Sequence, residues 1–136
     1  MIIWLASYPK SGNTYVRAFL SAYYFSENGQ FDFSQISNID QFPHEKFLKK
    51  KVKSEASRQW IPAQREINKD KKIKFFKTHS FLGNYQGNEF TSPETTLGAV
   101  YIIRDPRNVL SSLKNHYSFD DDKALKMITD KTRSLM

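Results

Sequence analysis

The chain has 136 residues and carries 21 Lys and Arg against 14 Asp and Glu, a formal net charge of +7. That length predicts a single domain over residues 1–136, with room for a modest core. The absence of cysteine excludes disulfide frameworks and thiolate metal sites, and it favours a reducing, cytoplasmic compartment. The apolar fraction of 39% is too high for a disordered chain, and the positive charge favours anionic partners.

Membrane and export signals are missing from the sequence. No apolar run approaches the ~20 residues that a membrane-spanning helix needs. The opening run at residues 1–6 is short and lacks the basic start of a signal peptide. We therefore expect a soluble intracellular protein.

The first predicted unit is a strand, a loop and a helix. Residues 2–6 form a continuous apolar run, which is typical of a buried strand, and residues 7–13 are rich in turn formers. A helix follows and closes at Asn28 and Gly29. Its predicted apolar face consists of Val16, Phe19, Leu20 and Tyr23.

The middle of the chain is strongly basic. Residues 30–43 are turn-rich, 44–70 predict one or two helices broken near Pro62, 73–77 predict a second strand, and 83–93 predict a loop. Residues 44–77 hold twelve Lys or Arg and four acidic residues. Such a segment is either a solvated helix face or a patch that binds a polyanion.

The last part of the chain predicts a third strand and two helices. Residues 99–103 are apolar, and Asp105 with Pro106 is a typical helix start, an N-cap acid before a first-turn proline. The acidic run at 120–122 suits the start of a final helix. Strands separated by helices predict an α/β fold with a parallel sheet flanked by helices. The apolar face of the first of these helices is predicted at Val109, Leu110, Leu113 and Tyr117.

The loop at residues 8–14 has the chemistry of a phosphate cradle. It follows a strand and precedes a helix, where open parallel sheets bind ligands. Gly12 allows close approach of an anion, Lys10 adds a positive charge, and Ser11, Asn13 and Thr14 add donors. It is not a Walker A motif, because Ser7 and Asn13 stand where that motif needs Gly and Lys. The same composition is also typical of a capped turn that binds no ligand, so this alternative stays open for the loop taken alone.

Three segments together resemble the sulfotransferases that use 3′-phosphoadenosine 5′-phosphosulfate (PAPS). They are residues 8–14 (YPKSGNT), residues 77–80 (KTHS), and residues 101–109 (YIIRDPRNV) with Ser112. The likeness extends from about Ile3 to Leu125. It implies a P-loop-like sulfotransferase fold, PAPS as the sulfuryl donor, 3′,5′-phosphoadenosine (PAP) as the product, and no metal.

The resemblance also implies roles for residues of the first loop. Lys10, Ser11, Gly12, Asn13 and Thr14 would bind the 5′-phosphosulfate, with Lys10 at the bridging oxygen. A cation at that place stabilises the charge that develops on the departing phosphate. Next to them, Tyr15 would stack on the adenine or pack in the core.

Further roles follow from the other two segments. His79 would be the base that takes the proton of the acceptor, and Lys77 would stabilise the transferring sulfuryl group. Arg104 and Ser112 would bind the 3′-phosphate. The structural alternatives are a strand-end histidine with no catalytic role, an Arg104–Asp105 ion pair and a helix-surface serine. His44, His116 and Arg107 have no such context and are predicted at the surface.

The chain also departs from the family pattern. Family members are usually longer and have a C-terminal basic, glycine-containing loop, whereas residues 124–128 resemble only the next helix. We expect a fragment, a naturally short form, or half of a site that is completed elsewhere, for example in a homo-oligomer.

The acceptor is expected to be a small molecule with a hydroxyl or amine. Five aromatic residues either line its pocket or belong to the core: Phe75, Phe76, Phe81, Tyr85 and Phe90. Two other functions stay open at this point. One is a basic module that binds RNA or another polyanion, although nucleic acid is not the expected partner, and the other is a non-catalytic nucleotide sensor.

Overall fold

The computed structural model of the protein describes residues 1–48 and 53–130. The three main strands are β1 (Ile2–Ser7), β2 (Lys74–Thr78) and β5 (Thr96–Ile102), and β3 (Asn84–Tyr85) and β4 (Asn88–Glu89) form a small hairpin. The α-helices are α1 (Asn13–Phe25), α2 (Trp60–Ile67), α3 (Pro106–Tyr117) and α4 (Asp121–Thr129). Short 3₁₀ helices are η1 (Phe33–Asn38), η2 (Lys53–Gln59) and η3 (Asn68–Asp70).

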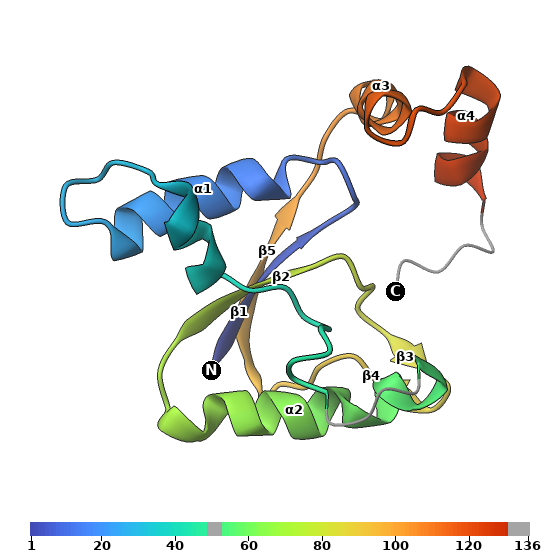
Figure 1. The fold of residues 1–136 in the computed structure, drawn as a ribbon. Helices are drawn as coiled ribbons and strands as arrows, with labels where there is room; N and C mark the ends of the chain where they lie inside the picture. The colour runs from blue at the N-terminus through green and yellow to red at the C-terminus, as the bar shows by residue number, and fades with distance from the viewer. Residues whose placement is uncertain (49–52, 131–136) are drawn as a thin grey trace.

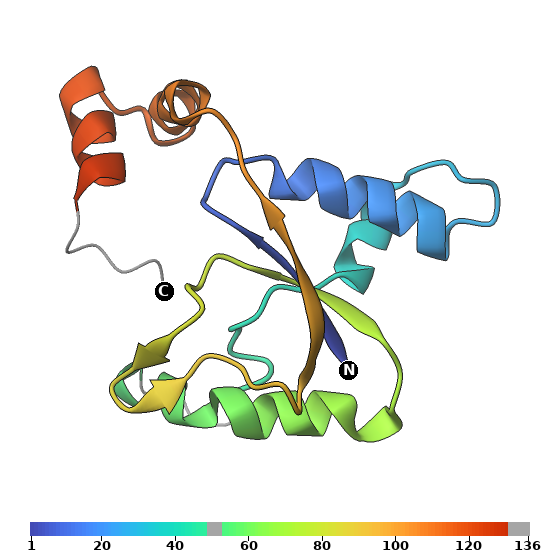
Figure 2. The ribbon, with the colours of Figure 1, turned by 180° about the vertical axis from the view of Figure 1, so that it is seen from behind.

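The three main strands form a parallel sheet in the order β2-β1-β5. α1 and α2 lie on opposite sides of it (Figures 1 and 2). The predicted α/β fold is therefore confirmed. Because the strands are parallel, Ser7, Thr78 and Ile102 all end at the same edge, and the loops after them meet there.

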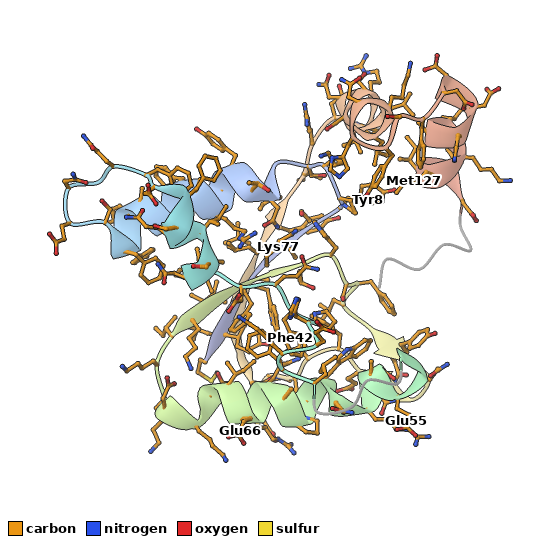
Figure 3. All side chains as sticks on the ribbon, in the orientation of Figure 1. Tyr8, Phe42, Glu55, Glu66, Lys77 and Met127 are labelled. Atoms are coloured by element: carbon orange, nitrogen blue, oxygen red, sulfur yellow. The ribbon has the colours of Figure 1, made fainter. Side chains whose placement is uncertain are left out.

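An aromatic cluster holds α2 to the sheet. The ring of Trp4 lies 5.7 Å from that of Phe42, 6.2 Å from Phe76 and 5.1 Å from Phe90, all measured between ring centroids. Trp60 of α2 packs on Phe90 from the helix side. Burial of each such side chain contributes roughly 1.5–3 kcal/mol to folding. Figure 3 labels Phe42, which lies inside this cluster.

A buried glutamine adds a polar connection to the same interface. The amide nitrogen of Gln64, on α2, donates to the carbonyl of Phe90 at 2.6 Å. Its amide oxygen accepts from the hydroxyls of Thr91 (2.6 Å) and Thr95 (2.8 Å). Gln64 thereby fixes the loop that leads into β5.

The predicted apolar face of α1 is only partly confirmed, because Val16 and Leu20 are half-buried but the other two residues are not. Phe19 and Tyr23 are 63% and 71% exposed, whereas Ser21 is buried. The helix is held through a different face, because Arg17 donates to the carbonyls of Ile36 (2.9 Å) and Ile39 (2.5 Å) and so fixes η1 against α1. The helix also ends at Phe25, before the predicted Asn28 and Gly29.

The basic segment also differs from its prediction. Residues 44–48 are turns, and the α-helix covers only Trp60–Ile67 between two 3₁₀ helices. Pro62 breaks no helix, because it lies in the first turn of α2, where its missing N–H group costs no hydrogen bond. Residues 49–52 of the predicted helices lie outside the described residues.

The other boundaries shift by a few residues. The second and third strands cover 74–78 and 96–102 where 73–77 and 99–103 were predicted, and the predicted loop 83–93 contains the β3–β4 hairpin. The third strand was also predicted to be buried. Instead Val100 and Tyr101 of this edge strand are exposed.

The two C-terminal helices pack on each other beside the edge of the sheet where its strands end (Figure 1). Asp105 caps α3 as predicted, and Asp120, from the acidic run predicted at the start of the last helix, caps α4, since each carboxylate accepts a backbone N–H of its helix. Val109 and Leu113 are buried against Met127, which confirms part of the predicted apolar face of α3. Within residues 1–48 and 53–130, no helix is both long and apolar enough to cross a membrane.

Replacement of Gln64 by Ala should lower the free energy of unfolding by about 2–4 kcal/mol, because it leaves buried polar groups of the loop without their partner. Arg65→Ala is the matched control: its ion pair with Glu94 is exposed, so the loss should stay below about 1 kcal/mol. Urea denaturation of both variants measures the difference. Equal losses would show that the Gln64 network adds nothing to stability.

Candidate active site

A buried asparagine fixes the shape of the loop after β1. The side-chain nitrogen of Asn13 donates to the carbonyl of Leu5 at 2.8 Å and to the Ser7 hydroxyl at 3.1 Å. Lys10 and Gly12 have positive φ angles of 67° and 99°, which turn the chain sharply between strand and helix. The side-chain nitrogen of Asn13 thus fixes the shape of the loop.

The start of α1 is suited to an anion. In the part of the chain that the structure describes, no side chain caps this helix. The first N–H groups of a helix have no intrahelical partner, and here no side chain takes that place. The helix dipole adds partial positive charge beside them. Backbone donors at the start of a helix after a glycine turn form a common phosphate site.

A cavity of about 490 Å³ opens in front of this helix start. Three cationic side chains, Lys10, Lys77 and Arg104, line it, and no acidic residue is found among its described lining residues. The other lining residues are Pro9, Gly12, Asn13, Thr14, His79, Ser112, His116 and Tyr117. The three predicted segments therefore meet at one cavity, which we call the cationic cavity.

Lys77 is held in this cavity near other cations. It belongs to β2 and pairs in register with Leu5, and its ammonium donates to the amide oxygen of Gln41 at 3.1 Å (Figure 3). Partial burial lowers the pKa of Lys77, and the positive charges of Arg17 and Lys10 lower it further. A bound anion would relieve this repulsion.

His79 is fixed by the end of β1. Its Nδ1 lies 2.7 Å from the carbonyl oxygen of Ser7 and 3.3 Å from the Ser7 hydroxyl. Because a carbonyl oxygen can only accept, Nδ1 carries the hydrogen, and the neutral ring keeps its lone pair on Nε2. Partial burial lowers the pKa of His79, and the positive charge of Lys77 lowers it further. The hydrogen bond to the Ser7 carbonyl acts in the opposite direction and raises it. The ring is therefore neutral at pH 7 and able to accept a proton.

Arg104 connects the cavity to the first loop. Its guanidinium donates to the carbonyl of Lys10 at 3.0 Å. The alternative ion pair with Asp105 is wrong, because Asp105 pairs with Arg107 in a two-pronged contact at 3.1 and 2.6 Å. Arg107 is 90% exposed, as predicted. Ser112 lines the same cavity as Arg104, one turn before His116 on α3.

Two predicted residues lie away from the cavity. Ser11 is buried and is not among its described lining residues. Tyr15 is 78% exposed, which rules out the core alternative, and its contact with adenine stays a prediction. His44 and His116 are exposed as predicted, yet His116 lines the cavity, a position that its spacing of four residues from Ser112 could have indicated.

A second cavity, of about 460 Å³, adjoins the first, and His79 lines both. Of the five aromatic candidates, Phe81 and Phe90 line it. Phe76 is a core residue, Tyr85 packs on Trp60, and Phe75 contacts Tyr24 on the other side of the sheet.

Four of the described cations of the basic segment form ion pairs. Lys46, Arg65, Lys69 and Lys74 each contact a carboxylate, those of Asp40, Glu94, Glu66 and Asp70 respectively. This arrangement favours the solvated-face interpretation for these residues. Within the described ranges, no group of three or more His, Asp or Glu side chains could hold a metal ion.

Comparison with known protein families gives one match. The family described as "Sulfotransferase domain" matches residues 2–134, nearly the whole chain. A search of curated proteins finds no match.

NMR of the histidine side chains should show His79 with its hydrogen on Nδ1 and with a pKa below the usual 6.5, since burial disfavours the charged ring. Because the pKa is lowered, the neutral form persists as the pH falls through 6.5. A hydrogen on Nε2 would contradict the assigned contact with the Ser7 carbonyl.

Proposed function

Because the chain belongs to the sulfotransferase domain family, we propose that it transfers a sulfuryl group from PAPS to the hydroxyl of a small acceptor. One observation carries the proposal. The cationic cavity combines a free helix start, three cations and a neutral histidine whose Nδ1 is already engaged.

The residues around the first loop would hold the phosphosulfate end of PAPS. The backbone N–H groups of Gly12, Asn13 and Thr14 would donate to its oxygens, and the hydroxyl of Thr14 and the ammonium of Lys10 line the same space. Lys10 would stabilise the charge on the leaving phosphate and Lys77 the charge of the sulfuryl group in transit. Such contacts accelerate transfer because they strengthen as the charge develops.

Arg104 and Ser112 would hold the 3′-phosphate, which distinguishes this nucleotide from ordinary ones. A planar guanidinium matches phosphate geometry well. The contact of Arg104 with the Lys10 carbonyl also ties this subsite to the loop that holds the other end of the nucleotide.

His79 would act as the general base. As the acceptor oxygen bonds to sulfur and the bond from sulfur to the bridging phosphate oxygen breaks, the acceptor proton passes to Nε2 of His79. The Ser7 carbonyl, which accepts from Nδ1, orients the ring and stabilises the imidazolium that forms. An amine acceptor would lose its proton in the same way.

Arg104→Ala should weaken the binding of PAP by about 1.5–3 kcal/mol, roughly ten- to a hundredfold, and change the binding of 5′-AMP far less. Arg107→Ala is the matched control, because Arg107 is exposed and pairs only with Asp105 among the described contacts. Calorimetry with both nucleotides gives the comparison. If PAP and 5′-AMP weaken alike, Arg104 has no role specific to the 3′-phosphate.

His79→Ala should lower the rate of sulfuryl transfer by about 10²-fold or more while PAP still binds, since the ring contributes proton transfer. His44→Ala, an exposed histidine away from both cavities, should leave the rate unchanged. Full turnover in the His79 variant would contradict the role of base. PAP binding without transfer to any acceptor by the unaltered protein would favour a nucleotide sensor instead.

A further inference from the structure

Neutral oxygen atoms, and not carboxylates, hold three cations at the candidate site. Arg104 and Arg17 donate to backbone carbonyls, and Lys77 donates to the side-chain amide of Gln41. No salt bridge among the described residues includes any of these three cations. Each described salt bridge joins an acid to a different cation: Lys46, Arg65, Lys69, Lys74, Arg107 or Lys114. The positive charge at the site is therefore fixed in place without being neutralised.

Residues 39–42 hold Lys77 by its backbone and by its side chain. The backbone N–H of Lys77 donates to the carbonyl of Asp40 at 2.7 Å, and its carbonyl accepts from the N–H of Phe42 at 2.9 Å. Gln41 lies between these two contacts, directly opposite Lys77 in a parallel bridge. Its amide oxygen accepts from the ammonium at 3.1 Å. One short segment thus fixes both the strand end and the charged group.

Buried residues anchor this segment on both sides of Gln41. Ile39 and Phe42 are buried, and the carbonyl of Ile39 accepts from Arg17. The ring of Phe42 packs on that of Trp4 in the aromatic cluster, and Figure 3 labels it below Lys77. Gln41 itself is exposed. A different side chain at position 41 therefore leaves the anchors of the segment unchanged.

The charged groups around Lys77 show why a neutral partner matters. Arg17 and Lys10 are close enough to lower its pKa, and His79 follows on the same strand end. The carboxylate of Asp40 is engaged with Lys46. A carboxylate on the Lys77 ammonium would bind it more strongly than an amide does, but it would cancel the positive charge that an anion needs.

We propose that Gln41 is a positioning residue for Lys77. Its amide oxygen holds the ammonium in the cationic cavity and leaves the full positive charge to the sulfuryl group in transit. The inference rests on the proposed function for the role of Lys77, whereas the contact between the two side chains is independent of it.

The test compares Gln41→Glu, Gln41→Leu and Gln30→Glu in the intact chain. Glu keeps the size of Gln and adds a negative charge, and Leu removes the acceptor. Gln30→Glu is the matched control, because it adds the same charge at an exposed residue that is not among the described lining residues of either cavity. Positions 30 and 41 are both exposed, so all three variants should fold.

An NMR titration of the lysine side chains measures the pKa of Lys77, whose signal is identified by its loss in Lys77→Arg. Gln41→Glu should raise this pKa, because an opposite charge favours the ammonium. Gln41→Leu should lower it, because the charged form loses its hydrogen-bond partner. Gln30→Glu should leave it unchanged. The same pKa of Lys77 in all four proteins would overturn the inference.

The rate of sulfuryl transfer at saturating PAPS is the second measurement. It should fall about tenfold or more in Gln41→Glu, whose carboxylate neutralises the ammonium, and by a smaller factor in Gln41→Leu. The binding of PAP should weaken far less, since PAP has no sulfuryl group. Rates equal to that of the Gln30 variant would overturn the inference, and so would equal losses of transfer and PAP binding.

Failure of the proposed function gives a different result. If the unaltered protein neither binds PAP nor transfers a sulfuryl group, the proposed reaction is wrong. The NMR titration then still decides whether Gln41 holds the Lys77 ammonium, because that measurement needs no nucleotide.

Discussion

The candidate site depends on the polar contacts at the end of β1. The Ser7 hydroxyl accepts from the side chain of Asn13, which opens α1, and the Ser7 carbonyl accepts from His79, which follows β2. Through this one residue the loop after β1 and the ring of His79 are held at a fixed distance from each other. Ser7 and Asn13 are buried, so water does not compete for these contacts. When side chains are held in place in this way before a ligand binds, little of the binding free energy is needed to order them.

The packing around this point divides the carboxyl edge of the sheet into two environments. On one side α1 contributes its free helix start and α3 contributes Ser112, while the cations of the cationic cavity come from β2 and from the loops after β1 and β5. On the other side the strands, Tyr8 and the segments 80–82 and 90–91 line the second cavity. His79 lies where they meet, and burial keeps it neutral.

The C-terminal helices are part of the same arrangement. Tyr8, from the first loop, packs against the buried cluster of α3 and α4, and its hydroxyl lies 3.4 Å from the carbonyl of Met127 (Figure 3). Arg104, just before α3, donates to the backbone of Lys10. The loop is therefore bound to β1 at one end and to α3 and α4 along its length. These contacts join segments about ninety or more residues apart in the chain.

Local patterns in the sequence determined much of the fold. The apolar run of residues 2–6, the Asp105-Pro106 helix start and the acidic run at 120–122 depend on near neighbours, and the strand and the two helix starts are found close to their predicted places. The three motifs likewise indicated Lys10, Lys77, His79 and Arg104, which the structure brings to one cavity. Local patterns failed where contacts with distant residues decide which side of a helix is buried. The regular spacing of Phe19 and Tyr23 predicted a buried face of α1, but the contacts of Arg17 with η1 hold the helix through a different face.

Only the tertiary structure decided which residues of the site contact one another. It showed that the side chain of Asn13 is engaged with β1, that Asp105 pairs with Arg107, and that His116 lines the cationic cavity. It also showed that Phe76 belongs to the core, that Phe81 lines the second cavity, and that Phe90 does both. The reason is that a side chain's partner is set by which strands and helices become neighbours, and spacing along the chain carries that information only within one element.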